Sequence, residues 1–508
     1  MSVAGIDIGT TGCKCTVFSD SGTWISEAYE EYHFAPEVGE RELDAAAVWD
    51  AVCSVIRRSA QKDAGIRAVA AASMGEAAVC LDEHDVPLNH PILYFDPRGE
   101  EENRELTARV GAERLYEITR MEPSKIYTVP KMMWLERHHP GFFRKAAHLL
   151  LMEDFIVYML SGTAQIDRTL ATRTYAFDMQ KLDWSDEILE AAGIPRSLMP
   201  RVVPTGTAAG KIRPALAAEL GLPGDTLIVS GAHDQPAAML GTGCLREGLA
   251  ADSTGTNECI TAFIDAGLHP DYLLQREVPY VPSLYENTYS SGIFCFTGGA
   301  MLKWFRDKIA PDEAERAKQN GMSAYDYFNS RVQDRPSGLI VLPYFLGKGA
   351  PGMDPDAKGT ILGLTPETNV FEIYRALMEG VSFEMRTGLE YWKSMGIELT
   401  ELRATGGGAR SPLWLQIKAD IFGIPVSTMK AEEGGALACA MLAAAAAGIY
   451  GSVEEAAKAF IRTDKTYLPD RERQAEYNEW YERYRVLEKR LSGAFDRNWG
   501  RSGSGGKR

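Results

Sequence analysis

Short apolar runs separated by polar turns that contain glycine mark the start of the chain. Residues 3–8, 14–18 and 24–29 each favour a strand, and the connections between them are short enough for an antiparallel meander. After Asp44, apolar residues recur at helical spacing and predict a helix. Residues 68–72 form a further apolar strand. A meander followed by a helix and a strand indicates an α/β fold rather than a helical bundle.

The pattern between about residues 100 and 225 is mainly helical. Helices are predicted at residues 131–137, 147–160 and 215–220, with prolines between them. We interpret much of this stretch as an insertion or cap on the first domain.

The opening pattern returns in the second half of the chain. Residues 248–252 and 258–264 predict two strands joined by a turn of small residues and hydroxyls, as at the start of the chain. The acid that precedes the turn is Asp7 in the first half and Asp252 in the second, about 245 residues later. Two such units at the heads of two similar halves predict a duplicated domain. The other predicted elements are strands at 292–296, 339–342 and 402–405, a Gly/Pro loop at 347–359, and helices from 299, at 370–385, at 413–422 and at 436–447.

Composition is ordinary for a globular protein and excludes some classes of partner. The 508 residues are 45% hydrophobic and 24% charged, which suggests two large domains. A formal net charge of −16 argues against nucleic acid and anionic membranes as partners. Eight scattered cysteines without a C-x-x-C pair argue against disulfides and a zinc site. The start of the chain lacks a signal-peptide pattern, and the alanine-rich run 436–447 is too short to span a bilayer, so we expect a cytoplasmic protein.

A carboxylate lies at the end of a predicted core strand near the middle of the chain. The apolar run 226–229 is followed by Gly231 and then by Asp234 and Gln235. A tight glycine turn in this position would let Asp234 face a cleft, where it could act as a general base. The alternative is that Asp234 only caps the helix that follows it.

Four loops place glycine and hydroxyl residues directly after a strand, at residues 9–12, 253–256, 297–299 and 406–408. Glycine lets backbone N–H groups approach an anion, although each loop alone could be an ordinary turn. The sequence contains no G-x-x-x-x-G-K-[ST] motif and no G-x-G-x-x-G motif in a βαβ context. Asp7 beside the first loop would repel phosphate unless a cation lay between them, which suggests Mg²⁺ held through water. Lys14 could pair with a phosphate or lie on the surface.

Together these residues resemble the FGGY family of carbohydrate kinases, in the sugar kinase/Hsp70/actin superfamily, and within it the xylulose kinases. The resemblance covers about residues 3 to 480. It implies two duplicated actin-like (ribonuclease H-like) ATPase domains with an interdomain cleft. The implied ranges are 1–245 for sugar and catalytic base, 246–485 mainly for nucleotide, and 486–508 for the end of a helix and a flexible tail. The motifs that carry it are Asp7-Ile8-Gly9-Thr10-Thr11, Lys131-Met132-Met133-Trp134-Leu135-Glu136, Gly231-Ala232-His233-Asp234-Gln235, Gly359 to Leu364 with Ala376 to Gly380, and Gly406 to Trp414.

The resemblance also implies roles for single residues. Asp234 matches the catalytic base, and Gln235 matches a sugar-contacting residue beside it. The residues that match nucleotide contacts are Thr10, Thr11 and Lys14 at the phosphate loop, Thr256 and Gly299 around the nucleotide, and Gly407 and Gly408 against adenosine. The cofactors implied are ATP and Mg²⁺, and a homodimer is a family-level expectation.

The chain departs from the family pattern at the predicted sugar site. Where xylulose kinases commonly carry Met-His and glycerol kinases Arg-Glu, this chain has Gly75-Glu76. Glu76 could accept hydrogen bonds from sugar hydroxyls or be a solvated loop residue. Asp96 and Arg98 could hold substrate or pair with each other. His233 is expected to point away from Asp234, as neighbours do along a strand.

The sequence therefore predicts ATP-dependent phosphorylation of a primary hydroxyl on a small carbohydrate. A ketopentose such as xylulose or ribulose comes first, followed by a hexulose, a tetrulose or a polyol of the glycerol or erythritol type. A nucleotide-dependent binding protein on the same fold is a second hypothesis, and a catalytically inactive sugar sensor is a third.

Overall fold

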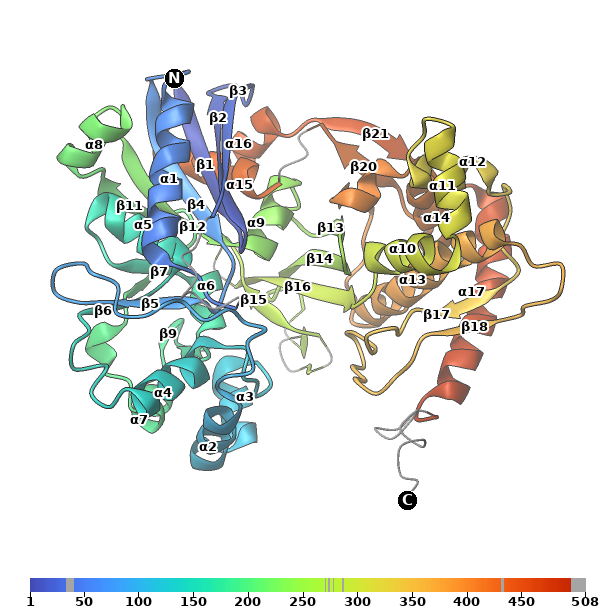
Figure 1. The fold of residues 1–508 in the computed structure, drawn as a ribbon, viewed down its shortest axis with the longest axis horizontal. Coiled ribbons are helices and arrows are strands. Elements are labelled where there is room, and N and C mark those ends of the chain that lie inside the picture. Colours follow the sequence, from blue (N-terminus) through green and yellow to red (C-terminus); the bar gives the residue numbers. More distant parts are fainter. Residues whose placement is uncertain are drawn as a thin grey trace. The chain divides into compact units, whose positions relative to one another are not determined.

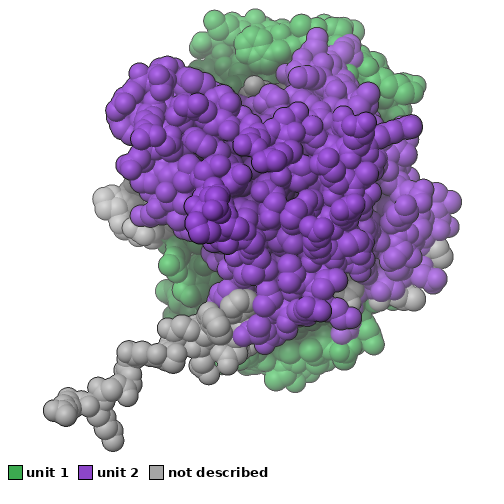
Figure 2. Space-filling model, turned by 90° about the vertical axis from the view of Figure 1, so that its right-hand side faces the viewer, with its two compact units in different colours: residues 1–243, 280–290, 433–461 green, residues 244–279, 291–432, 462–508 purple. Residues whose placement is uncertain are grey.

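A computed structural model of the chain describes residues 1–32, 41–269, 271–272, 275–276, 278–285, 287–430 and 434–494. Of the range 486–508 that was predicted to hold the end of a helix and a flexible tail, residues 495–508 lie outside the described part of the chain. Backbone contacts divide the chain into two compact units, which Figure 2 colours separately. Unit 1 comprises residues 1–243, 280–290 and 433–461, and unit 2 comprises residues 244–279, 291–432 and 462–508.

Unit 1 is built on a six-stranded mixed sheet with the order β11-β12-β4-β1-β2-β3. The antiparallel meander predicted at the start of the chain is confirmed, because β2 pairs antiparallel with both β1 and β3. On the other side of β1, β4 pairs parallel with β1, and β12 pairs parallel with β4. The strands are β1 (Ser2–Ile8), β2 (Gly12–Ser19), β3 (Trp24–Glu31), β4 (Ile66–Ser73), β11 (Ala208–Lys211) and β12 (Leu227–His233).

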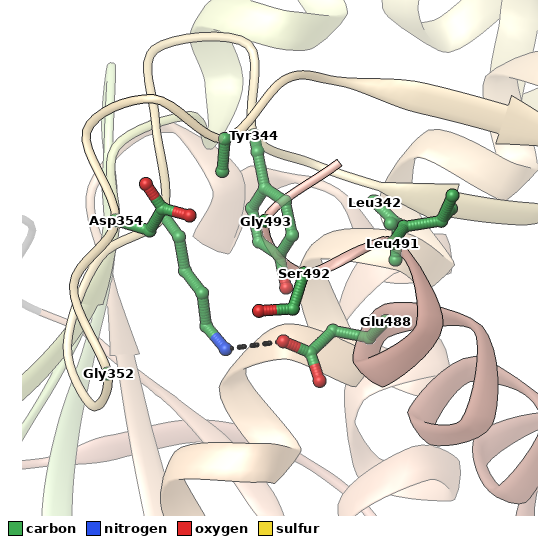
Figure 3. Close-up of a pocket in the computed structure, with 10 residues that line it drawn as sticks. Leu342, Tyr344, Gly352, Asp354, Glu488, Leu491, Ser492 and Gly493 are labelled. Atoms are coloured by element: carbon green, nitrogen blue, oxygen red, sulfur yellow. Dashed lines mark hydrogen bonds and ion pairs between the residues drawn. The ribbon is translucent and has the colours of Figure 1, made fainter. Parts of the chain in front are cut away.

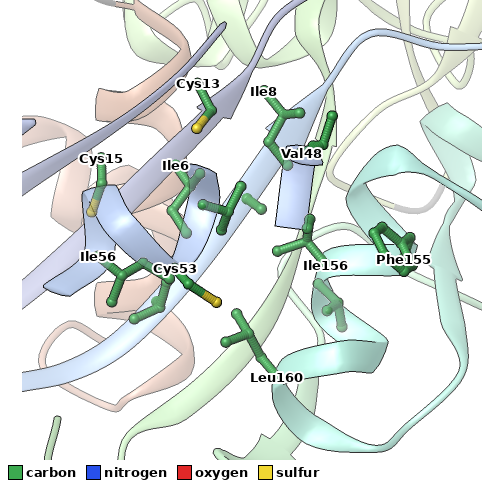
Figure 4. Packing of buried hydrophobic residues seen from close by; sticks show 14 of the residues in the cluster. Ile6, Ile8, Cys13, Cys15, Val48, Cys53, Ile56, Phe155, Ile156 and Leu160 are labelled. Atoms are coloured by element: carbon green, nitrogen blue, oxygen red, sulfur yellow. The ribbon is translucent and has the colours of Figure 1, made fainter. Parts of the chain in front are cut away.

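Helices cover the two faces of this sheet (Figure 1). On one face lie α1 (Ala45–Ala60), which begins at the predicted Asp44 cap, and α5 (Met152–Ser161). Because side chains alternate along a strand, Ile6 and Ile8 of β1 point to this face. Figure 4 shows them in one buried cluster with Cys13 and Cys15 of β2, Val48, Cys53 and Ile56 of α1, and Phe155, Ile156 and Leu160 of α5.

The opposite face of the sheet carries α15 (Gly434–Ala446), the predicted alanine-rich core helix. Residues 436–444 of this helix are all buried. A Cβ atom at Gly5 would lie 1.8 Å from the carbonyl oxygen of Ala436. Backbone therefore packs on backbone at this point, and alanine in the helix and glycine in the strand make that approach possible.

The stretch between β4 and β11 forms a mainly helical subdomain, as predicted. One part of the prediction was wrong: residues 148–151 of the expected helix 147–160 form a strand that pairs with β5, and the helix starts only at Met152. The subdomain contains β5 (Ala78–Leu81), α2 (Glu100–Val110), α3 (Ala112–Thr119), α4 (Thr128–His138), β6 (His148–Leu151), β7 (Gln165–Asp167), α6 (Arg168–Arg173), β8 (Phe177–Asp178), β9 (Asp183–Trp184), α7 (Asp186–Ala192), η1 (Arg196–Leu198) and β10 (Arg201–Val203). The remaining elements of unit 1 are α8 (Pro214–Leu220), α9 (Asp234–Gly241), β15 (Tyr280–Pro282) and α16 (Val453–Phe460).

The sheet of unit 2 repeats the topology of the first. Its order is β16-β14-β13-β19-β20-β21. As β1 does in unit 1, β13 pairs antiparallel with the next strand and parallel with a later one, and the parallel pair β19-β20 is followed by the antiparallel β21. The predicted duplication is confirmed at this level. The strands are β13 (Leu249–Thr254), β14 (Glu258–Asp265), β16 (Thr288–Cys295), β19 (Glu401–Thr405), β20 (Val426–Met429) and β21 (Thr463–Tyr467).

A long amphipathic helix, α13 (Val370–Ser394), runs through unit 2 with Tyr374, Leu377 and Val381 buried, and its existence was predicted. The strand expected at residues 339–342 is present at Ile340–Leu342, and the helix whose end was expected after residue 486 ends at Leu491, whereas the strand at Thr360–Leu362 was not predicted. The other elements are α10 (Gly299–Trp304), the π-helical turn η3 (Phe305–Ile309), α11 (Pro311–Gln319), α12 (Ala324–Arg331), β17 (Ile340–Leu342), β18 (Thr360–Leu362), η4 (Gly407–Arg410), α14 (Pro412–Phe422) and α17 (Arg471–Leu491).

The first of the three segments of unit 1 ends at residue 243. Residues 280–290 and 433–461 are grouped with unit 1, although they lie in the second half of the sequence. The predicted ranges 1–245, 246–485 and 486–508 stay a prediction, as does the interdomain cleft. All eight cysteines are free. Within the described parts of the chain, no helix combines the length and apolar character that a bilayer crossing requires.

Replacing Gly5 by alanine should lower the free energy of unfolding by about 3 kcal/mol or more, because the added methyl group meets the Ala436 backbone, which cannot move without displacing α15. Urea and thermal unfolding midpoints measure the effect. Gly224→Ala is the matched control, since a Cβ atom there has no neighbour within 4 Å. Equal midpoints for the two variants would contradict the backbone packing of β1 on α15.

Candidate active site

Asp234 begins helix α9 immediately after strand β12. The predicted tight glycine turn before it was wrong, because β12 continues to His233 and contains a bulge between Ser230 and Ala232. The bulge residue is Gly231, where a Cβ atom would lie 1.8 Å from the Ala71 carbonyl oxygen. Glycine is therefore required for the close approach of β12 to β4.

Three side chains from the helical subdomain hold the end of β12. The Gly231 N–H donates to Glu153 Oε1 at 2.9 Å, and the His233 N–H donates to Thr169 Oγ1 at 2.8 Å. Gln165 Nε2 donates to Ser230 Oγ at 3.0 Å. Burial raises the pKa of Glu153 well above its usual value, with Asp154 and Asp167 adding to the shift. A protonated Glu153 can accept the Gly231 N–H without leaving an unpaired buried charge.

The Asp234 carboxyl group is partly shielded, and one of its two oxygens lacks a hydrogen-bond partner among the described residues. Its side chain is 41% exposed, but Oδ1 is buried and accepts no hydrogen bond from the described residues. The alternative that Asp234 caps α9 is not what the structure shows, because this helix has no side-chain cap. Burial raises the pKa of Asp234 to about 6, although the amide groups of Gln235 and the Arg173 guanidinium oppose the shift. Gln235 itself is exposed.

His233 lies beside Asp234 rather than pointing away from it, so that expectation was wrong. Its Nε2 is 3.2 Å from Asp234 Oδ1. Alternation along a strand no longer applies here, because the strand ends at His233 and a helix begins at the next residue. Burial and the nearby Arg173 lower the pKa of His233 to about 3. The imidazole is therefore neutral near pH 7 and adds no charge beside the carboxylate.

Glu76 is buried, which excludes the alternative of a solvated loop glutamate. The side chain is 6% exposed, and its Oε1 accepts hydrogen bonds from Nε (2.7 Å) and Nη2 of Arg173. Its backbone is left-handed, with φ of 64°, and its carbonyl oxygen accepts the Thr128 hydroxyl at 2.8 Å. A left-handed glutamate costs free energy, which these contacts offset.

Gly75 makes room for Arg173. A Cβ atom at Gly75 would lie 2.8 Å from Arg173 Cγ and 3.2 Å from His233 Cδ2. The guanidinium also stacks over the Tyr127 ring at 5.4 Å, and that ring stacks on Tyr175 at 4.8 Å. Gly75, which departs from the family pattern, thus leaves space that Arg173 of α6 occupies.

Asp96 and Arg98 pair with each other, one of the two alternatives left open by the sequence. Arg98 donates from Nε to Asp96 Oδ1 at 2.8 Å and from Nη2 to Oδ2 at 3.0 Å, and its Nη1 lies 2.5 Å from Glu42 Oε1. Lys131 Nζ donates to the Asp96 carbonyl oxygen at 3.3 Å. Burial lowers the pKa of Lys131 to about 8. Whether Asp96 and Arg98 also contact a substrate stays a prediction.

The first predicted phosphate loop is a tight turn after β1, closed by the Gly9 N–H donating to the Gly12 carbonyl at 3.0 Å. Thr10 is half-buried and Thr11 exposed. Lys14 lies opposite Asp7 in the β1–β2 register, 3.7 Å from Glu27.

Asp7 points to the opposite face of the sheet from Ile6 and Ile8, toward the first turn of α15. A Cβ atom at Gly435 would lie 3.0 Å from Asp7 Oδ2. No group of three or more His, Cys, Asp or Glu side chains is arranged to hold a metal ion within the residues that the structure describes. A single carboxylate fits the predicted Mg²⁺ held through water better than a direct ligand cage.

In unit 2 the three predicted loops pack on one another. The amides of Gly298, Gly299 and Ala300 donate to the carbonyls of residues 255 and 256, so these N–H groups have partners within the protein. A Cβ atom at Gly408 would lie 2.3 Å from Thr254 Cβ. By contrast, Gly255 has no neighbour within 4 Å on its Cβ side, and Gly407 meets only the Thr254 carbonyl at 3.9 Å. These two glycines leave open space that a nucleotide could fill, and the loops therefore fit one.

A buried ion cluster holds the end of β13, which leads into the first of these loops. Lys418 Nζ donates to Asp252 Oδ2 (2.7 Å), Thr254 Oγ1 (2.7 Å) and Glu258 Oε1 (2.6 Å). Burial raises the pKa of Glu258 well above its usual value, although Lys418 opposes the shift. The cluster fixes Thr254 at the end of β13, against which Gly406 and Gly408 pack.

A small cavity of about 60 Å³ in unit 2 involves none of the predicted site residues. Figure 3 shows Tyr344, Asp354, Glu488 and Ser492 around it, with Lys348 Nζ 2.7 Å from Glu488 Oε1.

Sequence reasoning missed Arg173 and Glu153. Arg173 follows Glu76 by 97 positions and Glu153 precedes Gly231 by 78, so no local pattern joins them. Gly75 was the one available signal, since the missing side chain left space for another residue.

Two family models match most of the chain. The N-terminal domain model of the FGGY family of carbohydrate kinases matches residues 2–241, and the C-terminal domain model matches residues 250–447. The chain is 26% identical over 497 residues to a xylulose kinase of Bacillus subtilis strain 168, covering 96% of each chain. It is 29% identical over 480 residues to a gluconokinase of Bacillus licheniformis, covering 93% of each.

A crystal structure described as xylulose kinase from Rhodospirillum rubrum superimposes with a TM-score of 0.87 at 26% identity, covering 97% of this chain and 100% of that one. The two-domain α/β fold with duplicated actin-like topology is thereby confirmed. The chain belongs to the FGGY family of carbohydrate kinases and is a sugar kinase.

Proposed function

We propose that the protein transfers the γ-phosphoryl group of ATP to a primary hydroxyl of a small carbohydrate, with Asp234 as general base. A ketopentose such as xylulose or ribulose is the first candidate. The observation that carries the proposal is the Asp234 carboxyl group, whose buried Oδ1 accepts no hydrogen bond from the described residues. Its pKa near 6 leaves it ionised at pH 7 and basic enough to accept a proton.

One proton moves in this step, and one bond to phosphorus forms as another breaks. The sugar hydroxyl gives its proton to Asp234 as its oxygen bonds to phosphorus, and the bond from phosphorus to the oxygen that leaves with ADP breaks. Asp234 then returns the proton to solvent. Neutral His233 beside the carboxylate stays uncharged and does not compete for this proton. When bound, ATP supplies the phosphoryl group and Mg²⁺ neutralises its charge. Asp7 would hold that ion through water, beside Thr10, Thr11 and Lys14.

We assign most of the nucleotide contacts to unit 2. Gly255 and Gly407 support this assignment, because both have open space where a Cβ atom would be. Gly408 and Gly299 would act by shaping the loops, since a Cβ atom on either would clash with protein atoms. The Thr256 hydroxyl would add a donor. In unit 1, Gln235, Asp96 and Arg98 stay candidate sugar contacts beside Asp234.

Other substrates stay open within the same reaction. The relatives include both xylulose kinases and gluconokinases at similar identity, which favours no single sugar. A hexulose, a tetrulose or a polyol is the second candidate. A nucleotide-dependent binding protein is a third, and ATP consumption that no carbohydrate stimulates would support it. A homodimer and a cytoplasmic location stay predictions from the resemblance and the sequence.

A coupled assay of ADP release, run over ketoses and alditols of four to six carbons and over aldonates, tests the proposed function. We expect at least one neutral ketose or polyol to stimulate ATP consumption strongly and to yield a sugar monophosphate. No stimulation by any of these compounds would contradict the proposal.

Replacing Asp234 by asparagine should lower kcat at least about a hundredfold, because the amide cannot accept the hydroxyl proton, while sugar affinity stays nearly unchanged. Steady-state kinetics and equilibrium sugar binding measure the two effects separately. Asp225→Asn, at an exposed carboxylate in the loop before β12, is the control and should behave as wild type. Turnover close to wild type in Asp234→Asn would remove Asp234 from this role.

The pH dependence of kcat/KM should show an acid limb near pH 6. The ionised carboxylate is the competent form, and burial raises the pKa of Asp234 to about 6, so activity is lost as pH falls through that value. A profile of kcat/KM between about pH 5 and 8 measures it. The residual rate of Asp234→Asn should lack this limb, and a limb that persists there belongs to another group.

Alanine substitutions at two neighbouring glycines distinguish an effect on nucleotide binding from an effect on loop packing. Gly407→Ala should raise the apparent KM for ATP about tenfold with an unchanged unfolding midpoint, because its methyl group enters open space proposed for the nucleotide. Gly408→Ala should instead lower the unfolding midpoint, since its methyl group meets Thr254. If Gly407→Ala raised only the sugar KM, the assignment of nucleotide to unit 2 would be reversed.

A further inference from the structure

We infer that Arg173, paired with Glu76, is the specificity-determining residue of the sugar site and selects an uncharged ketose or polyol over a sugar acid. This inference rests on the proposed function and goes beyond it, because it separates two classes of substrate that the relatives leave open. It concerns unit 1 alone.

Arg173 lies beside the proposed base. Its positive charge lowers the pKa values of both His233 and Asp234. It is surrounded by the Gly75 backbone, the Tyr127 ring and the Glu76 carboxylate. Its side chain is 20% exposed, so part of the guanidinium is open to a ligand. A substrate hydroxyl that reaches Asp234 brings its neighbouring hydroxyls close to this group.

The ion pair leaves one donor and one acceptor unused. Arg173 binds Glu76 Oε1 through Nε and Nη2, while the described contacts use neither Arg173 Nη1 nor Glu76 Oε2. Neither of these two atoms is among the fully buried unpartnered atoms. The unused Nη1 donor and the unused Oε2 acceptor belong to one ion pair, and each can bind one substrate hydroxyl group, which accepts from Nη1 or donates to Oε2.

The pair is held rigidly. Three contacts fix the two side chains. Arg173 fills the space beside Gly75 and lies over the Tyr127 ring, which stacks on Tyr175. The Thr128 hydroxyl donates to the Glu76 carbonyl oxygen. Arg173 therefore loses little rotamer entropy when a ligand binds, whereas an unconstrained surface arginine would lose more.

The local charge disfavours an anionic substrate. The carboxylates of this region are Glu42, Glu76, Asp96 and Asp234, and the cations are Arg98, Lys131 and Arg173. Arg98 is neutralised by Asp96 and Glu42, and Arg173 by Glu76. With Asp234 ionised as the base, one negative charge is in excess. A sugar carboxylate placed here meets repulsion instead of a free guanidinium.

Glu76 is consequently the partner through which Arg173 discriminates between neutral sugars and sugar acids. Glu76→Gln keeps the shape and an oxygen for Arg173 but releases one unneutralised positive charge. We expect this variant to weaken binding of neutral ketoses or polyols about tenfold, because a carboxylate acceptor is lost. Binding of aldonates should strengthen, so that the ratio of the two dissociation constants shifts at least about tenfold toward the acid.

Isothermal titration without ATP tests this, so that the result does not depend on turnover. The probes are D-xylulose, D-ribulose, ribitol and D-arabinitol as neutral compounds, and D-xylonate, D-ribonate and D-gluconate as acids. Wild type should bind at least one neutral probe more tightly than every acid. Glu83→Gln, at a carboxylate that is 84% exposed, is the control and should leave all ratios unchanged.

The second variant, Arg173→Gln, covers the case in which Glu76→Gln does not fold. It should weaken the neutral probe at least about tenfold and should not improve any acid. The inference is overturned if wild type binds an acid at least as tightly as every neutral probe, or if neither variant moves the ratio by more than about twofold. Failure of the proposed function shows differently, as sugar binding without sugar-stimulated ATP consumption.

Discussion

The close backbone contact between Gly231 and Ala71 is the constraint on which the candidate active site depends. No Cβ atom fits between β12 and β4 at this point, so the strand can bulge there and still continue to His233. The bulge turns the Gly231 N–H out of the ladder, and the buried Glu153 accepts it. An unpaired N–H would cost about 1–3 kcal/mol. Strand, bulge and buried acid together determine where Asp234 begins its helix.

Glycine serves the same purpose in several other places. Gly5 packs on Ala436, Gly241 on Gly434, and Gly408 on Thr254, each with too little space for a methyl group. A glycine that follows a strand can therefore have one of two roles. It can let parts of the protein pack closely on each other, or it can leave space for a ligand to approach the backbone. Only the structure separates Gly407, which faces open space, from Gly408, which does not.

The sequence predicted the repeated elements well because their signals are local. The meander at the start, the helix after Asp44, the helix α13 and the duplicated strand–turn–strand units follow from periodicity and turn residues. The strand β6 was missed because its three leucines directly precede a helix and continue the apolar pattern of that helix. At the site, Asp234 and Glu76 were found from their positions in motifs. Arg173 was not, because its relation to Glu76 is tertiary and no spacing encodes it.

The Glu76–Arg173 pair also explains how Asp234, the proposed base, can stay basic beside a guanidinium. An unneutralised arginine next to Asp234 would lower the pKa of that carboxyl and make it a poor proton acceptor. Glu76 offsets the charge, and the neutral His233 adds none, so burial is left as the dominant influence and raises the pKa of Asp234. The left-handed backbone of Glu76 is the conformational cost of bringing its carboxylate to Arg173. The departure from the family pattern at Gly75-Glu76 is therefore compensated within the same cluster, and the basicity of Asp234 depends on that compensation.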